Sequence, residues 1–433
     1  MIFLSIALSL VAAVVLFGVH RRFRARSLGF RGSIELNATA VEPDTSETAS
    51  LAESGSSIQD TIIDTIYAIG DLHGDAKCAK EWISATGLVD ESFTKWLQPT
   101  ANLVFVGDYI DKGPTSLQTA LMVKSLTETF PSRVTALMGN HEMEALMDRS
   151  SASDRRMYFY QLPYSTVHPD DLLNYIPHGA KTANTTKALD VLYDLALDEV
   201  YGKNKFRSVD FSPYGSKSVC NLIDDPDLAS MVREELAMLQ SHYIAAFASS
   251  TPLGQWMEKL PITYVFEDLI FMHGGLNPAI LEVDGGIRSL SDLSALNSNF
   301  HAHSSDSSIA SFMRTLSGQI VYDLLTYRGN HKSCAEVSGV AEALGLSKVI
   351  VGHTPDDDVR MSCGGKFLAI DSALGRWIRK NGNQYCRGEE TKVSQNGRYA
   401  CEKIDESCGG QIVKMVKKNG EWAVELLSLS GAI

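Results

Sequence analysis

The strongest constraint on the fold is a repeated pattern in which a short apolar run ends at a glycine, and a polar residue follows directly. Such runs lie at 66–70, 102–107 and 133–139, and each is followed by a polar motif and a stretch with helical character. Apolar runs that alternate with helices are typical of βαβ units with parallel strands. Right-handed crossovers place the loops after these strands on one sheet edge, where α/β proteins bind ligands. The sequence therefore predicts an α/β fold with a polar site at that edge.

Five polar motifs occur in chain order, and each carries a side chain that can bind a metal ion. They read Gly-Asp-Leu-His-Gly (70–74), Gly-Asp-Tyr-Ile-Asp-Lys-Gly (107–113), Gly-Asn-His-Glu (139–142), His-Gly-Gly (273–275) and Gly-His-Thr (352–354). A single motif is weak, because Gly-Asp and His-Gly pairs are common in turns. Five in order on successive strand ends favour one shared metal site. The predicted ligands are Asp71, His73, Asp108, Asn140, His273 and His353.

The chemistry of these ligands indicates which metals they suit. Carboxylate, amide and imidazole groups without thiolate favour Mn, Fe or Zn over Ca or Cu(I). Asp108 is the candidate to bridge two ions, and two ions about 3.5–4 Å apart can activate a bridging hydroxide for in-line attack on a phosphoryl group. A nucleophilic side chain is then unnecessary. The chain accordingly contains neither a Cys-x5-Arg phosphatase loop nor a Gly-Lys-Ser/Thr phosphate loop.

Two further roles are predicted around this site. His141 directly follows Asn140, so one of the two side chains can face the metal and the other the leaving group. We therefore predict His141 as the general acid and Asp111 as the carboxylate that orients it. Lys112 and Arg328 are predicted to contact the phosphate oxygens, together with Asn140.

The five blocks resemble those of the calcineurin-like metallophosphoesterases, and within them the phosphoprotein phosphatases. The stretch Leu-Leu-Thr-Tyr-Arg-Gly at 324–329, followed by Cys334 and by Val-Gly-His-Thr-Pro at 351–355, is similar to the Shewanella-like Ser/Thr phosphatases. The resemblance covers roughly residues 66–376, apart from an insertion at 150–260. It implies an αββα sandwich with two metal ions that hydrolyses phosphomonoesters, with a phosphoprotein as its substrate.

One position departs from the family signature. The second block normally reads Gly-Asp-x-x-Asp-Arg-Gly, and Lys112 stands where the family has arginine. Lysine keeps the charge but lacks the planar fork that binds two oxygens at once. On the same resemblance, Arg328 is the second phosphate-binding arginine. The predicted metal ligands show no departure, so we expect an active enzyme.

The N-terminal segment over 1–26 differs from the rest of the chain. Residues 2–19 are uncharged and apolar, and four arginines follow within 20–26. Eighteen residues span about 27 Å as a helix, near the lower limit for crossing a bilayer. Because the basic residues follow the apolar run, a single-pass membrane anchor is favoured over a cleaved signal, with the catalytic domain in the cytosol. Sequons at Asn37 and Asn184 keep a luminal location open, and an organellar targeting sequence is a further alternative.

Composition and pattern divide the remaining chain. Residues 27–64 are rich in Ser, Thr, Asp and Glu, which predicts a disordered linker. The catalytic domain is expected over 65–433. Within it, 150–260 carries Tyr-rich and helical stretches and is interpreted as a helical insertion that covers the site. The segment 376–433 is expected to add C-terminal strands, and the Ser-rich stretch 297–311 is predicted to be a loop.

Cysteine usage and charge limit other classes of function. The seven cysteines include no Cys-x-x-Cys pair, so neither a zinc ribbon nor a disulfide framework is indicated. Cys386, Cys401 and Cys408 cluster near the C-terminus, and a disulfide among them is an open alternative. The net charge of −13 argues against nucleic-acid binding along the whole surface.

Three functional hypotheses follow from the sequence. The preferred one is a Ser/Thr phosphoprotein phosphatase tethered to a membrane, with a phosphoprotein as partner and no nucleic acid. A small-molecule phosphatase or a dinucleotide polyphosphate hydrolase would use the same metal blocks and differ in the cleft shaped by 150–260. A membrane-tethered, non-catalytic scaffold is the third hypothesis, and the complete ligand set argues against it.

Overall fold

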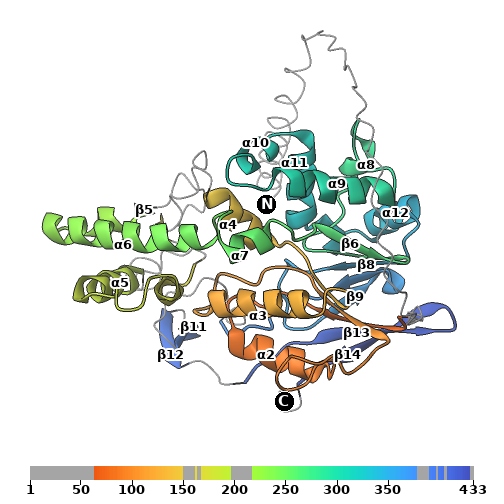
Figure 1. Ribbon diagram of the computed structural model, residues 1–433, viewed down its shortest axis with the longest axis horizontal. Helices are drawn as coiled ribbons and strands as arrows, with labels where there is room; N and C mark the ends of the chain where they lie inside the picture. The colour runs from red at the N-terminus through yellow and green to blue at the C-terminus, as the bar shows by residue number, and fades with distance from the viewer. Residues whose placement is uncertain are drawn as a thin grey trace, which may run out of the picture. The chain divides into compact units, whose positions relative to one another are not determined.

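Figure 1 shows the computed structural model of the chain. The structure describes residues 63–149, 161–162, 167–196, 217–377, 390–395, 398–403 and 407–429. These residues all belong to one compact unit, Gln59–Ile433. The segment predicted as an anchor, and all but the last two residues of the predicted linker, lie outside the described residues.

The first sheet has the strand order β14-β13-β1-β2-β3. Its parallel strands are β1 (Thr65–Ile69), β2 (Ala101–Phe105) and β3 (Val134–Ala136). A helix follows each of them, as the alternating pattern predicts, and these helices are α2 (Ala76–Ala85), α3 (Ser116–Thr129) and α4 (Asn140–Asp148). The predicted βαβαβ arrangement is therefore confirmed.

A C-terminal hairpin extends this sheet on the other side of β1. Strand β13 (Ile412–Lys418) pairs antiparallel with β1, and β14 (Glu421–Leu427) pairs antiparallel with β13. The turn between them consists of Asn419 and Gly420, with φ angles of 54° and 88°. Two consecutive positive φ angles are what a two-residue hairpin turn of this kind requires, and Asn-Gly adopts them most readily.

The second sheet has the strand order β6-β7-β8-β10-β9. Strands β7 (Leu269–Met272), β8 (Lys348–Val351) and β10 (Phe367–Ala369) are parallel. Strands β6 (Thr263–Phe266) and β9 (Arg360–Ser362) pair antiparallel at the two edges. The described part of the chain also contains α8 (Ala279–Glu282), α11 (Leu316–Thr326), α12 (Cys334–Leu344), the short helices η5 (Val219–Leu222), η6 (Gly329–His331) and η7 (Cys363–Gly365), and the separate hairpin β11 (Glu390–Gln395) and β12 (Arg398–Lys403).

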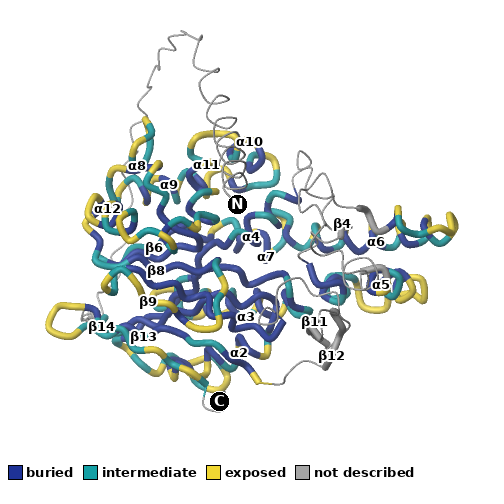
Figure 2. The backbone as a smooth tube through the Cα atoms, turned by 180° about the vertical axis from the view of Figure 1, so that it is seen from behind, coloured by how far each residue is buried: buried dark blue, intermediate teal, exposed yellow. Residues whose placement is uncertain are grey.

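The two sheets pack face to face, and helices cover their outer faces (Figure 1). Alternate residues of the central strands belong to different cores, so Ile66 and Ile350 pack between the sheets whereas Tyr67 and Val349 pack under the helices. Strands buried on both faces need apolar residues at every position, which explains their continuous apolar runs. Figure 2 shows this buried centre in dark blue. The αββα sandwich implied by the resemblance is confirmed.

The described residues within 150–260 are largely helical. They form η2 (Pro169–Asn174), α5 (Ala183–Ala196), α6 (Pro226–Ala246) and α7 (Pro252–Met257), with one short strand pair, β4 (Gln161–Leu162) and β5 (Lys217–Ser218). Helices α5 and α6 lie side by side in both views (Figures 1 and 2). Helix α6 begins with strong local signals, because Asp225 accepts hydrogen bonds from two backbone N–H groups and proline occupies the first turn.

The prediction of a loop over 297–311 is wrong for most of its length. Helix α9 (Leu290–His303) runs into it, and α10 (Ile309–Phe312) follows. Ser289 and Asp292 form a capping box at the start of α9. Leu293, Leu296 and Phe300 then make a buried stripe at helical spacing. The apolar spacing, and not the serine content, determines the structure here.

The predicted single-pass membrane anchor is not supported and is corrected. The segment 1–26 lies outside the described residues, and among the described residues no helix is both long and apolar enough to cross a bilayer. Helix α6 has 21 residues but carries Arg233, Glu234 and Glu235 along its length.

Two disulfides correct the expectation drawn from cysteine spacing. Cys78 pairs with Cys408, 330 residues away in the sequence, and Cys334 pairs with Cys363. Cys408 belongs to the C-terminal cysteine cluster, but its partner lies in α2, outside that cluster. The side chains of Cys386 and Cys401 lie outside the described residues. The spacing of neighbouring cysteines did not indicate these disulfides because both join segments that are distant in the sequence.

Candidate metal centre

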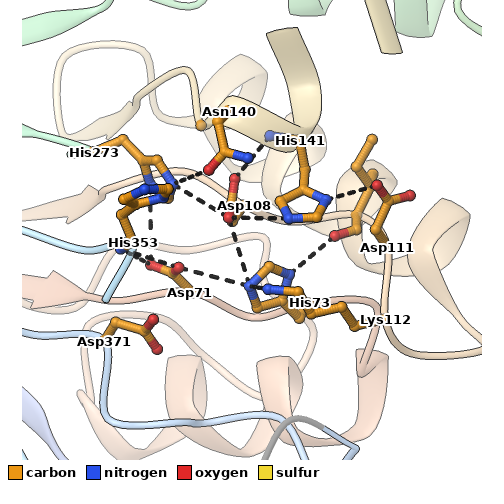
Figure 3. A network of polar contacts seen from close by, with 12 residues as sticks. Asp71, His73, Asp108, Asp111, Lys112, Asn140, His141, His273, His353 and Asp371 are labelled. Carbon is orange, nitrogen blue, oxygen red and sulfur yellow. Dashed lines mark hydrogen bonds and ion pairs between the residues drawn. The ribbon is translucent and has the colours of Figure 1, made fainter. Parts of the chain in front are cut away.

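The carboxyl ends of five parallel strands supply the predicted metal ligands. Asp71 and His73 follow β1, Asp108 follows β2, Asn140 opens α4 after β3, and His273 and His353 follow β7 and β8. Figure 3 shows these side chains converging on one place. The sandwich therefore gathers residues that span 71 to 353 in the sequence. The structure brings all six predicted ligands together, and their roles as ligands stay predictions.

Backbone conformation and close packing explain the glycines in the motifs. A Cβ on Gly139 would lie 2.2 Å from an Asp108 carboxylate oxygen, and one on Gly352 would lie 2.3 Å from an Asp71 carboxylate oxygen. Only glycine lets the backbone approach these carboxylates so closely. His73, Asp108 and His353 themselves have positive φ angles of 42°, 56° and 67°. Such conformations cost about 1 kcal/mol or more each and concentrate at functional sites.

The Oδ2 atom of Asp108 lies at the centre of the cluster. It is 3.2 Å from Nε2 of His273 and 3.5 Å from Nε2 of His73. Two groups of potential ligand atoms, each within 4.8 Å of one another, share this carboxylate. One group adds His273 and His353, and the other adds His73 and His141. A shared carboxylate between two imidazole groups fits the predicted bridging role of Asp108.

Asp71 and Asn140 complete the two sides of the cluster. Asp71 Oδ2 lies 3.6 Å from His73 Nε2, and both of its oxygens accept the backbone N–H of His353. Asn140 Oδ1 lies 3.0 Å from His273 Nε2. The donor set therefore divides into Asp71 and His73 on one side and Asn140, His273 and His353 on the other, with Asp108 between them. Its oxygen and nitrogen donors fit Mn, Fe or Zn.

Backbone carbonyl groups fix the orientation of two histidines. Nδ1 of His73 donates to the carbonyl oxygen of Ile110 at 3.2 Å, and Nδ1 of His273 donates to that of Val106 at 2.9 Å. This places the proton on Nδ1 and directs the lone pair of Nε2 into the cluster, as metal-binding histidines require. Burial lowers the pKa of His73 to about 3, so this imidazole is neutral at pH 7.

The carboxylates and imidazoles of the cluster shift one another's pKa values. Burial alone would raise the pKa of Asp108, but the nearby imidazoles of His273 and His141 lower it well below its usual value. Conversely, burial disfavours the charged form of His273, but the nearby carboxylates of Asp108 and Asp71 raise its pKa to about 9. A bound cation would displace that proton, because only neutral imidazole acts as a ligand.

Glu142 is a residue of the site that the sequence analysis left without a role. Its two carboxylate oxygens accept backbone N–H groups from Asp108, Tyr109, Ile110 and Gly139 at 2.8–3.2 Å. It thereby joins the start of α4 to the loop that carries Asp108. The available signal was its position three residues after Gly139, where a glutamate can accept the backbone N–H of the residue that precedes the helix.

His141 and Asp111 form a buried pair beside the cluster. Nδ1 of His141 lies 2.6 Å from Oδ2 of Asp111, and Nε2 of His141 lies 3.8 Å from Oδ2 of Asp108. Burial opposes protonation of His141, but Asp108 and Asp111 raise its pKa to about 9. The ring therefore carries a proton at neutral pH, which it can donate from Nε2.

Two cationic side chains flank the cluster. Nζ of Lys112 lies 2.9 Å from Nε2 of His73. The exposed Arg328 follows α11 and donates from Nη1 to Oγ1 of Thr354, next to His353. Lys112 and Arg328 thus stand at the two sides of the ligand cluster, and their contacts with phosphate stay predictions.

Part of the chain that carries this site is similar to a known protein family. Residues 65–219 match the calcineurin-like phosphoesterase family. An uncharacterized protein of Schizosaccharomyces pombe is 24% identical over 314 residues, which cover 71% of this chain and 73% of that protein. The segment that matches the family carries the first three motifs.

Solved structures give further matches. A cold-active protein-tyrosine phosphatase of a psychrophilic Shewanella species has a TM-score of 0.49 and 16% identity, covering 86% of this chain and 83% of that one. A protein serine/threonine phosphatase of Saccharomyces cerevisiae has a TM-score of 0.40 and 14% identity, covering 86% and 81%.

Proposed function

We propose, from the calcineurin-like metallophosphoesterase domain that this chain contains, that the protein is a phosphoprotein phosphatase with two metal ions. The domain indicates a metal-dependent phosphoric ester hydrolase. The observation that supports hydrolysis with two metal ions is the position of Asp108 Oδ2 between the two histidine groups, beside the His141–Asp111 pair. This arrangement supports two metal positions next to a proton donor.

The six predicted ligands would divide between the two ions. Asp71, His73 and Asp108 would hold one ion, and Asp108, Asn140, His273 and His353 the other. Such ions supply Lewis acidity and a water that is nucleophilic at neutral pH. The chain needs no nucleophilic side chain of its own.

The remaining residues bind and protonate the substrate. Lys112, Arg328 and Asn140 bind phosphate oxygens and orient the ester. His141 donates its Nε2 proton to the leaving oxygen as the phosphorus–oxygen bond breaks. Asp111 accepts the Nδ1 proton in a hydrogen bond, which orients the ring and stabilises its charged form.

Metal analysis combined with substrate kinetics on the full chain tests this proposal. We expect two ions of Mn, Fe or Zn per chain and hydrolysis of a phosphoserine or phosphothreonine peptide. A phosphotyrosine peptide, a sugar phosphate and diadenosine tetraphosphate are the comparison substrates. Preference for one of these would replace the proposed substrate class. Absence of both metal and hydrolysis of p-nitrophenyl phosphate, with Mn added, would instead support a binding scaffold.

A further inference from the structure

Helix α6, which lies in the insertion, reaches into the predicted proton-donating pair. The hydroxyl of Tyr243 donates a hydrogen bond to Oδ1 of Asp111 at 3.0 Å, across 132 residues of sequence. Tyr243 is only 2% exposed, and Asp111 is 3% exposed. This contact is not part of the five motifs, and the predicted mechanism makes no use of it.

Asp111 has a separate partner for each of its polar groups. Oδ2 faces Nδ1 of His141 at 2.6 Å, and Oδ1 accepts the Tyr243 hydroxyl. Its backbone N–H donates to Oγ of Ser116 at 2.9 Å. A carboxylate bound on both oxygens cannot rotate without breaking one bond. The Tyr243 hydroxyl therefore contributes to holding the plane in which Asp111 meets the imidazole.

Aromatic packing holds the Tyr243 ring in place. It meets the ring of Tyr175 edge to face at 4.9 Å and that of Phe247 at 5.0 Å. The Tyr175 hydroxyl in turn donates to Oδ2 of Asp171, whose Oδ1 accepts the backbone N–H of Ser116. Elements η2 and α6 thus form one buried support under Asp111. Burial, followed by the nearby Asp111 carboxylate, raises the pKa of Tyr243 well above its usual value, so its hydroxyl keeps the donated proton.

We propose that Tyr243 is a positioning residue for proton donation by His141, so that the insertion takes part in leaving-group departure. The inference rests on the proposed phosphatase function. As the bond between phosphorus and the leaving oxygen breaks, its electron pair stays on that oxygen, which takes the Nε2 proton of His141. The oxygen of the attacking water forms the new bond to phosphorus, and the proton that this water releases restores the charged form of His141. The products are phosphate and an alcohol or phenol. Tyr243 transfers no proton and acts through Asp111.

The test compares two aryl phosphates that differ in leaving group. Phenolate is a poor leaving group, since a phenol of this kind has a pKa near 10, and its departure depends on a proton donor. Dinitrophenolate is a much better leaving group and needs little protonation. Tyr243→Phe removes the hydroxyl and keeps the ring. We expect kcat for phenyl phosphate to fall about 10-fold, a part of the 10²–10⁴-fold that general acids contribute, with KM unchanged. The kcat for 2,4-dinitrophenyl phosphate should change less than about 2-fold.

The ratio of the two kcat values is the decisive readout. It does not depend on the fraction of folded enzyme, so a partly destabilised variant still gives an answer. Tyr264→Phe is the matched control, because it removes a tyrosine hydroxyl from β6 in the second sheet, and it should leave the ratio unchanged. In an Asp111→Asn background, Tyr243→Phe should have no further effect on the ratio.

The outcomes separate the two proposals. An equal loss of kcat on both substrates, or no loss on either, would overturn the role of Tyr243 while leaving the phosphatase proposal intact. If the wild-type chain with bound Mn hydrolyses neither substrate, the proposed function fails, and this inference fails with it. A ratio that shifts in Tyr243→Phe and not in Tyr264→Phe supports the inference.

Discussion

The two oxygens of Asp108 have different surroundings. Oδ1 accepts the backbone N–H of His141 at 3.1 Å, whereas Oδ2 lies 3.2 Å from His273 Nε2 and 3.5 Å from His73 Nε2. Oδ2 is thus the only oxygen of this carboxylate positioned for ligands on both sides. His141 contacts the same carboxylate but is held at its other nitrogen by Asp111. The two residues should therefore respond differently to substitution.

We expect Asp108→Asn and His141→Asn each to lower kcat roughly 100-fold or more. Only Asp108→Asn should also reduce the bound metal, because it removes the negative charge shared by the two histidine groups. Metal analysis of the purified variants, alongside phosphopeptide kinetics, distinguishes the two effects. Equal metal loss in both variants would show that His141 is a ligand and not the general acid.

The lysine at position 112 allows a direct test of phosphate recognition. Its Nζ lies 2.9 Å from His73 Nε2, at the side of the cluster. Lys112→Arg restores the planar fork that can bind two oxygens, so turnover should be preserved or improved. Lys112→Met, which removes the charge, should raise KM. Steady-state kinetics on one phosphopeptide compares all three enzymes, and a severe loss in Lys112→Arg would place Lys112 outside the phosphate site.

At the scale of single elements, η2 contains a buried carboxylate, that of Asp171, whose pKa is raised. Asp171 accepts hydrogen bonds from Ser116 N–H and Asn174 Nδ2, yet burial raises its pKa from its usual value of 3.8 to about 7. The folded state therefore binds more protons than the unfolded state between about pH 4 and pH 7. The free energy of unfolding therefore decreases as pH rises through this window.

Asp171→Asn should remove this pH dependence. Its remaining oxygen can still accept both hydrogen bonds, and its amide can donate to the Tyr175 hydroxyl oxygen. We expect the variant to gain stability relative to wild type at pH 8 but not at pH 4, measured by urea unfolding. Asp284→Asn, at an exposed position, is the control and should give a constant difference across this range. A constant difference for Asp171→Asn as well would contradict the assigned titration.

The elements that the sequence predicted are those with a local signal. Ile66 and Val349 lie in strands buried on both faces, so a continuous apolar run marked each strand, and the loop glycines marked the ligands that follow. The contact from Tyr243 to Asp111 has no such signal, because it depends on how α6 packs against a loop 132 residues earlier. Helix α9 was missed because its serines obscured an apolar stripe at helical spacing.

At the scale of the whole molecule, the two disulfides cross-link distant parts of the described chain. Cys78–Cys408 joins α2, directly after the first metal-binding loop, to the segment before β13. Cys334–Cys363 joins the start of α12 to η7. Stable disulfides are typical of proteins in oxidising compartments.

Removing the longer cross-link should destabilise the fold. A disulfide restricts the unfolded chain, and loss of a native one typically costs about 2–5 kcal/mol. We therefore expect the double variant Cys78→Ser, Cys408→Ser to lose about that much free energy of unfolding in urea without reductant. The unpaired, buried Cys220 provides the control, because Cys220→Ser leaves both disulfides intact. Its response to dithiothreitol should match that of wild type, whereas the double variant should respond less, since only Cys334–Cys363 remains to be reduced. An unchanged unfolding midpoint in the double variant would show that Cys78 and Cys408 are not bonded in the native protein.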